Sequence, residues 1–242
     1  MTTPHQPRGT PIDLIWEYRE QLLSGTLVTV QLALGSLLIA VVLGFLGAGA
    51  KLSGSRVLGA VANGYTTLVR GVPDLVLILL VFFGGQQAVN QLGAATGLWG
   101  YVEVSQFAAG VGTIGVIFGG YFTEVFRGAI LAVPKGQIEA ATATGMTRAQ
   151  VFRLVTLPQM VRHALPGFTN TWLVQIKATA LVSVIGLQDL VYNAFVAGRS
   201  TRELFTFMFA VLVIYLALTA VSDLALRGLE RRANRGQPRM AA

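Results

Sequence analysis

Cysteine and charged side chains are both scarce in this chain. None of the 242 residues is cysteine, which excludes disulfide bonds and thiolate metal sites. Charged residues make up 12% of the chain, whereas an ordinary soluble domain is about a quarter charged. So few charges cannot cover a water-facing surface, and 53% of the residues are hydrophobic. The composition therefore predicts a membrane protein.

The chain also lacks a Walker A motif, which requires a Gly-rich loop and a lysine followed by Ser or Thr. Lys51 is followed by Leu52, and Lys135 by Gly136. A membrane enzyme would instead need a cluster of reactive side chains at membrane depth, and the apolar runs hold almost none. We therefore expect no enzyme, no metal site and no cofactor bound to this chain.

Long apolar runs are abundant. A bilayer core needs about 20 helical residues to cross it. Four runs without charge and a fifth interrupted by Lys177 reach or approach this length: Leu22–Ala50, Leu75–Tyr101, Val104–Thr123, Leu204–Ser222 and Ala164–Gln188. A β-barrel would show shorter segments of alternating polarity. We therefore predict an all-α polytopic protein with one domain, 1–242, and five spans at about 22–50, 73–93, 104–126, 164–188 and 204–226.

The basic residues predict the orientation. Thirteen of the eighteen lysines and arginines fall after the first, third and fifth spans, and four fall on the other side. Because cytoplasmic loops carry the excess of Lys and Arg, we expect a periplasmic N-terminus and a cytoplasmic C-terminus. The net charge of +7 thus reflects topology and contact with lipid, and we expect no nucleic-acid partner.

Two breaks are expected between the spans. The run Val57–Val69 ends at Pro73, which favours a short helix, a break and a new helix, with one long kinked helix as the alternative. A polar loop, 134–162, predicts two short helices bent at Gly145. Thr147 would cap the second of these helices, and Pro158 would end it.

The loop carries a recognisable pattern. Glu139-Ala140-Ala141, with Gly145 four residues further on and Leu157-Pro158 at the end, resembles the EAA loop of ABC-importer permeases. The flanking Phe126-Arg127-Gly128 and Pro134-Lys135-Gly136-Gln137 are similar to the polar amino-acid branch, as are the segments Arg70–Pro73 and Lys177–Ser183. Nearly the whole chain resembles permease subunits of histidine/lysine/arginine/ornithine importers and of octopine and nopaline importers.

That resemblance implies the type I ABC-importer permease fold and a role as half of a translocation pore that works by alternating access. It implies as partners two ATP-binding subunits that hold ATP and magnesium, a second homologous permease, and a periplasmic binding protein delivering a polar amino acid. The coupling residues would be Glu139, Ala140, Ala141, Gly145, Phe152 and Pro158, in a loop that docks on the ATP-binding subunit. The loop could instead be an amphipathic segment on the lipid surface.

Three charged residues are candidates for the pore or a gate. Lys177 lies inside the fourth apolar run, so it either faces the pore or extends its ammonium to the cytoplasmic interface. Glu124 and Arg127 share one helical face and either line the path of a cationic substrate or form a structural ion pair. Arg70 is the third candidate. We expect Asp189 to be an exposed helix cap.

An ion-gradient-driven secondary transporter is the alternative function. Such transporters usually have more spans and inverted repeats. Five spans and no visible repeat argue for the importer.

Overall fold

The computed structural model describes residues 10–233, and these form helices without any strand. The α-helices are α1 (Pro11–Glu17), α2 (Arg19–Leu52), α3 (Arg56–Gly71), α4 (Asp74–Leu79), α5 (Gly85–Thr96), α6 (Gln106–Leu131), α7 (Lys135–Ala143), α8 (Arg148–Val151), α9 (Leu157–Ala178), α10 (Leu190–Thr201) and α11 (Leu204–Ala233). Two π-helical segments, Leu80–Gly84 and Phe152–Thr156, and a 3-10 segment, Thr179–Ile185, connect some of them.

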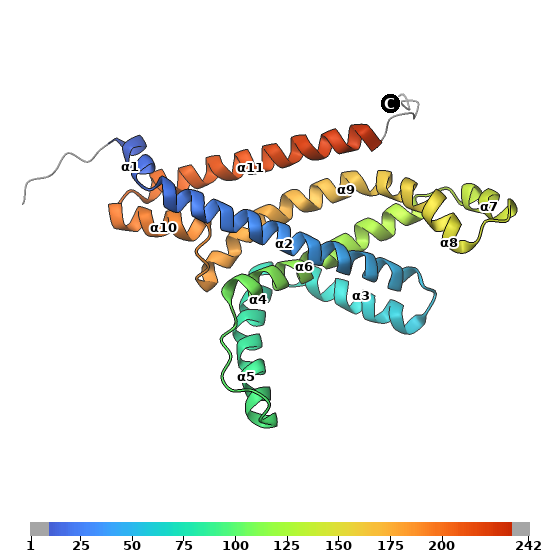
Figure 1. Ribbon diagram of the computed structural model, residues 1–242, viewed down its shortest axis with the longest axis horizontal. Coiled ribbons are helices and arrows are strands. Elements are labelled where there is room, and N and C mark those ends of the chain that lie inside the picture. Colours follow the sequence, from blue (N-terminus) through green and yellow to red (C-terminus); the bar gives the residue numbers. More distant parts are fainter. Residues whose placement is uncertain (1–9, 234–242) are drawn as a thin grey trace, which may run out of the picture.

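The long helices form a bundle. In Figure 1, α2, α6, α9 and α11 run along the long axis of the molecule, while α4 and α5 project sideways from it. The short helices α7 and α8 lie at one end of the bundle, and α1 and α10 lie at the other (Figure 1). The first described helix and the last turn of α11 are therefore at opposite ends.

Within residues 10–233, four helical stretches are long and apolar enough to cross a membrane: Arg19–Leu52, Asp74–Thr96, Gln106–Leu131 and Leu204–Ala233. A fifth crossing arises if the pair Arg148–Ile185 and Leu190–Thr201, bent by 53° at its break, counts as one span. The prediction of an all-α polytopic protein is confirmed. Helices α2, α6 and α11 extend past the C-terminal ends of the predicted spans, to Leu52, Leu131 and Ala233, because polar turns continue the helix after the apolar run.

Among the helices of the described part of the chain, α2 and α6 make the most extensive contact. Glycines let the two helices approach closely. A Cβ added at Gly44 would lie 2.6 Å from Cβ of Phe122, and one added at Gly115 would lie 2.7 Å from Cβ of Ile39. In lipid no hydrophobic effect drives helices together, so small residues at such contacts stabilise the pair by allowing close van der Waals packing. The core of the bundle is therefore built around this pair.

The break before the second span has the predicted form. Helix α3 ends at Gly71, Val72 is extended, and Pro73 caps α4. The alternative of one kinked helix is wrong.

Two other expectations are also wrong. Pro158 does not end a helix, because it lies in the first turn of α9, directly after the π-helical segment Phe152–Thr156. The wider π turn accommodates a residue that lacks an N–H and would clash in a regular helix. Asp189 does cap α10, accepting a hydrogen bond from Tyr192 N at 2.8 Å, but it is fully buried and not exposed.

Candidate functional site

The loop between α6 and α9 is bent sharply at Gly145. Its φ is +85°, in the left-handed region that glycine adopts without steric cost. The bend is closed by two hydrogen bonds, from Gly145 N to Thr142 O at 3.0 Å and from Met146 N to Ala141 O at 3.3 Å. This pair of bonds is the Schellman arrangement that ends helices at a left-handed residue. The elbow is thus a defined structure and not a loose connection.

The helix after the elbow begins with a capping box. Thr147 Oγ1 accepts a hydrogen bond from Gln150 N at 3.4 Å, and Gln150 Oε1 accepts one from Thr147 N at 2.8 Å. Each side chain thereby satisfies a backbone donor at the start of α8. A further hydrogen bond joins the two arms of the loop, from Gln159 Nε2 to Gln137 Oε1 at 2.5 Å.

The predicted coupling residues lie on different sides of this loop. Glu139, Ala140, Gly145 and Pro158 are exposed, and Phe152 leaves 47% of its surface exposed. Ala141 is 7% exposed and packs inward, so it supports the elbow and does not present a surface. The exposed face of α7 therefore includes the small side chain of Ala140 and one carboxylate, that of Glu139. An exposed phenylalanine lies on the neighbouring segment.

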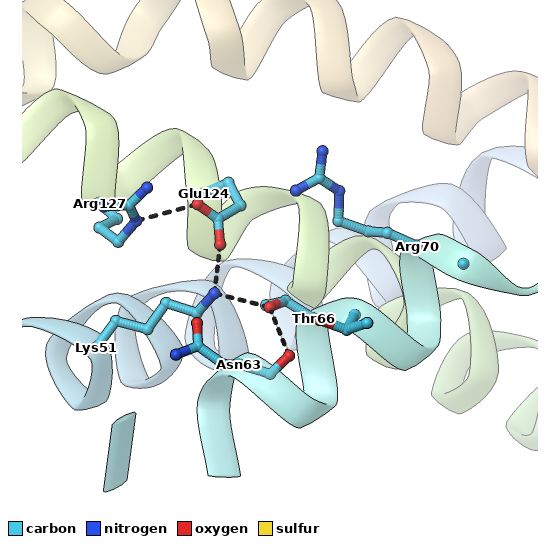
Figure 2. A pocket seen from close by; sticks show the side chains of 8 residues that line it. Lys51, Asn63, Thr66, Arg70, Glu124 and Arg127 are labelled. Carbon is cyan, nitrogen blue, oxygen red and sulfur yellow. Dashed lines mark hydrogen bonds and ion pairs between the residues drawn. The ribbon is translucent and has the colours of Figure 1, made fainter. Parts of the chain in front are cut away.

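A polar cavity of about 580 Å³ lies between α2, α3 and α6. Figure 2 shows this cavity and its charged side chains. It is lined by Lys51, Asn63, Thr66, Thr67, Arg70, Gly71, Glu124 and Arg127. The predicted candidates Arg70 and Glu124 thus share one cavity, whereas Lys177 does not line it.

Glu124 is at the centre of the polar network. Its Oε1 lies 2.5 Å from Lys51 Nζ, and its Oε2 lies 3.0 Å from Arg127 Nε. Lys51 Nζ also donates to Thr66 Oγ1 at 2.7 Å, and its side chain is only 9% exposed. The structural ion pair of Glu124 with Arg127 is present, and the pair also lines the cavity.

Lys51 is the residue that the sequence interpretation missed. From the sequence it was considered only as a lysine that does not fit the Walker A motif and as one of the thirteen basic residues that predict the orientation, yet it supplies the most buried charge of the cavity. The sequence signal is its place in the last turn of the long helix α2, whereas its contact with Glu124 of α6 comes only from the structure. Arg70 lies apart from this network (Figure 2), with its guanidinium carbon 5.5 Å from the centre of the Tyr121 ring. Three cations and one carboxylate leave the cavity with excess positive charge.

Lys177 lies on α9, which contributes no lining residue to the cavity. It is exposed on α9, and no hydrogen bond or ion pair involves its side chain within residues 10–233. In the same part of the chain, no group of three His, Cys, Asp or Glu side chains could hold a metal ion.

Comparison with known proteins identifies the family and the relatives of this chain. The family described as "Binding-protein-dependent transport system inner membrane component" matches residues 22–235. The histidine/lysine/arginine/ornithine transport system permease protein HisQ of Escherichia coli (strain K12) is 51% identical over 93% of this chain and 99% of its own length. The octopine transport system permease protein OccQ of Rhizobium radiobacter is 43% identical over 93% of this chain and 94% of its own.

Solved structures of ABC transporters match the fold of this chain. An amino acid ABC transporter with histidines matches with a TM-score of 0.79 and 31% identity, covering 96% of this chain and 100% of that one. The MetNI methionine ABC transporter in an inward-facing conformation matches with a TM-score of 0.67 at 19% identity, which bears on the fold alone.

Proposed function

The chain belongs to the family of binding-protein-dependent transport system inner membrane components, and on that premise we propose that it forms half of the translocation pore of an ATP-driven importer for polar, basic amino acids. Like its relatives, it is a permease subunit. It is not an enzyme. The observation that carries the substrate class is the identity of 51% to a histidine/lysine/arginine/ornithine permease along nearly the full length of both chains. The opines are the other substrates that the relatives' names suggest.

The proposed partners are two ATP-binding subunits, a second homologous permease and a periplasmic substrate-binding protein. ATP and magnesium would be bound by the ATP-binding subunits. The elbow at Gly145 supports this assignment, because transmitting motion from a motor to a pore requires a rigid element that docks. Glu139 would pair with a basic residue of the motor, Ala140 would permit close approach, and Phe152 would fill an apolar pocket. Ala141 and Pro158 would hold the shape of the loop.

The proposed cycle is alternating access. ATP binding would close the motor and move the docked loop, and the pore would open towards a loaded binding protein. Hydrolysis would return it to the inward-facing state. Arg70 and Glu124 would line the inner part of the path in the cavity between α2, α3 and α6, where Lys51 and Arg127 fix the carboxylate of Glu124.

The test is reconstitution of the complete complex in proteoliposomes. Uptake of arginine, histidine, lysine, ornithine and octopine would be measured with and without ATP inside the vesicles. We expect uptake that requires ATP and the binding protein. Uptake that ignores ATP and follows an ion gradient would instead favour a secondary transporter.

The proposed orientation has a separate test, which uses the absence of cysteine in this chain. Single cysteines would replace Ile12 on α1 and Ala140 on α7, both of which are exposed. With a thiol reagent that does not cross membranes, added to intact spheroplasts, we expect labelling at position 12 and none at position 140 until the cells are opened. The reverse pattern would overturn the proposed orientation.

A further inference from the structure

One side of α11 is not packed against the rest of the described chain. The helix contacts α9, α10 and α1 with its other side, and in Figure 1 it runs along one edge of the bundle. Every exposed residue from Leu204 to Ala225 is apolar. These two residues are 21 positions apart, which is about 32 Å along a helix. Because the hydrocarbon core of a bilayer is about 30 Å thick, this face has the length and the composition that suit lipid tails.

Arginines follow this apolar face directly. Leu224, Arg227 and Arg231 are all exposed and are spaced by three and four residues, so their side chains lie on one side of the helix, one turn apart. The same line passes through the exposed Phe205, Phe209, Leu216 and Ala220. Arg227 begins about 3 Å past the last exposed apolar residue of the face, and Arg231 lies about 6 Å further along the axis. Their guanidinium groups are therefore at the level of lipid headgroups.

These guanidinium groups are available to a ligand. Arg227 Nε lies 2.8 Å from Oδ2 of Asp223, one turn back on the same helix, and the Arg227 side chain is still 61% exposed. Within residues 10–233, no hydrogen bond or ion pair involves the side chains of Arg231 or Arg232. A guanidinium presents a planar fork of donors that matches the oxygens of a phosphate. The end of α11 thus offers phosphate-binding groups at the depth where phosphates lie.

The rest of the sequence adds positive charge at this end alone. From Arg231 onward there is no aspartate or glutamate, and the arginines are Arg231, Arg232, Arg235 and Arg239, of which the last two lie outside the described residues. At the other end of the helix, Arg202 is followed by Glu203. A cluster of about four or more basic residues next to the cytoplasmic end of a transmembrane helix is typical of binding to anionic lipid.

We infer that the end of α11 formed by Arg227, Arg231 and Arg232 binds the phosphate groups of anionic phospholipids, and that the apolar face before it contacts their acyl chains. In the proposed orientation these lipids are in the cytoplasmic leaflet. The inference goes beyond the proposed function, because it assigns a lipid partner and concerns no step of transport. A zwitterionic lipid also carries a phosphate, but the arginines repel its ammonium group, so this surface selects headgroups with net negative charge.

The test measures which lipids surround this end of α11 in the complete complex. Since this chain has no native cysteine, Gly228→Cys introduces one thiol for a fluorophore beside Arg227, where an added Cβ meets nothing within 4 Å. The other subunits carry no reactive cysteine. The labelled complex is reconstituted in phosphatidylcholine vesicles, in which part of the lipid is replaced by phosphatidylglycerol or phosphatidylcholine with brominated acyl chains. Quenching by each brominated lipid gives the binding constant of phosphatidylglycerol relative to phosphatidylcholine.

We expect phosphatidylglycerol to bind about fivefold more tightly or better, since each basic residue near an anionic headgroup contributes about fivefold. Raising the salt from about 0.1 M to about 1 M should bring the ratio of binding constants towards one, because the screening length falls from about 10 Å to about 3 Å. A ratio of one at the lower salt concentration overturns the inference. An absence of quenching by either lipid also overturns it, since protein would then cover this face.

Substitutions separate this surface from the net charge of the protein. Replacing both Arg231 and Arg232 with glutamine should bring the ratio of binding constants close to one, whereas Asp223→Asn should raise the ratio, because it leaves Arg227 unpaired. The matched control is Arg56→Gln, at the exposed start of α3 and predicted on the same side of the membrane, and it should leave the ratio unchanged. An equal fall for the control and the double variant overturns the local site.

Two of these readouts do not depend on the double variant. If that variant does not assemble, the salt dependence and the ratio for Asp223→Asn decide the same point, and a ratio that neither salt nor Asp223→Asn changes overturns the inference. None of the measurements requires transport. A complex that takes up no amino acid with ATP but keeps its preference for phosphatidylglycerol at position 228 would contradict the proposed function and support the lipid surface.

Discussion

Replacing Gly145 with alanine is expected to weaken docking of the permease on its ATP-binding subunit. A Cβ added at Gly145 meets nothing within 4 Å, so the substitution causes no clash in this chain. The cost comes from the backbone alone, because φ is +85° and an L-residue in the left-handed region costs about 1–2 kcal/mol. If docking requires this bend, the affinity falls by about fivefold to thirtyfold, since about 1.4 kcal/mol is a factor of ten.

The matched control is Gly136→Ala in the same loop. Gly136 also has nothing within 4 Å of an added Cβ, but it lies in α7 with ordinary helical φ. Alanine there is expected to stabilise the helix by up to about 1 kcal/mol, so docking should hold or improve. Gly145→Asn should fall between the two, since asparagine tolerates the left-handed region better than alanine does.

The assay is a titration of purified ATP-binding subunits onto the permease in nanodiscs, followed by ATP-driven uptake for the same variants. Equal affinities for Gly145→Ala and Gly136→Ala would refute the reasoning, because the two substitutions differ only in backbone conformation. A loss of uptake without a loss of affinity would place the effect of Gly145 after docking.

Two further predictions concern the bundle. Glu124→Gln leaves the nearly buried Lys51 without its carboxylate and should destabilise the solubilised permease by about 3 kcal/mol, while adding Lys51→Met should recover part of that loss in a double-mutant cycle of thermal unfolding; additive effects would contradict the pairing. Gly44→Ala places a Cβ 2.6 Å from Cβ of Phe122, and such overpacking should cost about 1–3 kcal/mol. Gly49→Ala, also in α2 but with open space around the added Cβ, should be neutral or stabilising, and equal melting temperatures for the two would count against the close contact of α2 and α6.

Much of the fold was predictable because the membrane imposes local rules. An apolar run without charge must form a helix to satisfy its own backbone in lipid, so Leu22–Ala50 alone indicates the span that α2 forms. The break at Pro73 and the elbow at Gly145 depend on φ preferences of single residues, which are also local. These features needed no knowledge of distant contacts.

Other features followed no recognisable residue pattern or depended on segments that are distant in sequence. Pro158 is held in a continuing helix by the π-helical segment before it, which no residue pattern announced. Lys51 joins the cavity only because α2 and α6 cross where its side chain reaches Glu124. The hydrogen bond between Gln175 and Ser36, residues 139 positions apart, brings the end of α9 next to the middle of α2.

The sequence by itself determined the membrane class, the helical spans and the bent loop, because these depend on hydropathy and on the backbone preferences of individual residues. Only the tertiary structure decided which charges meet in the cavity and that Asp189 is buried. The physical reason is that the energy of a charge at membrane depth depends on its neighbours in space, and those neighbours come from helices far apart in the chain.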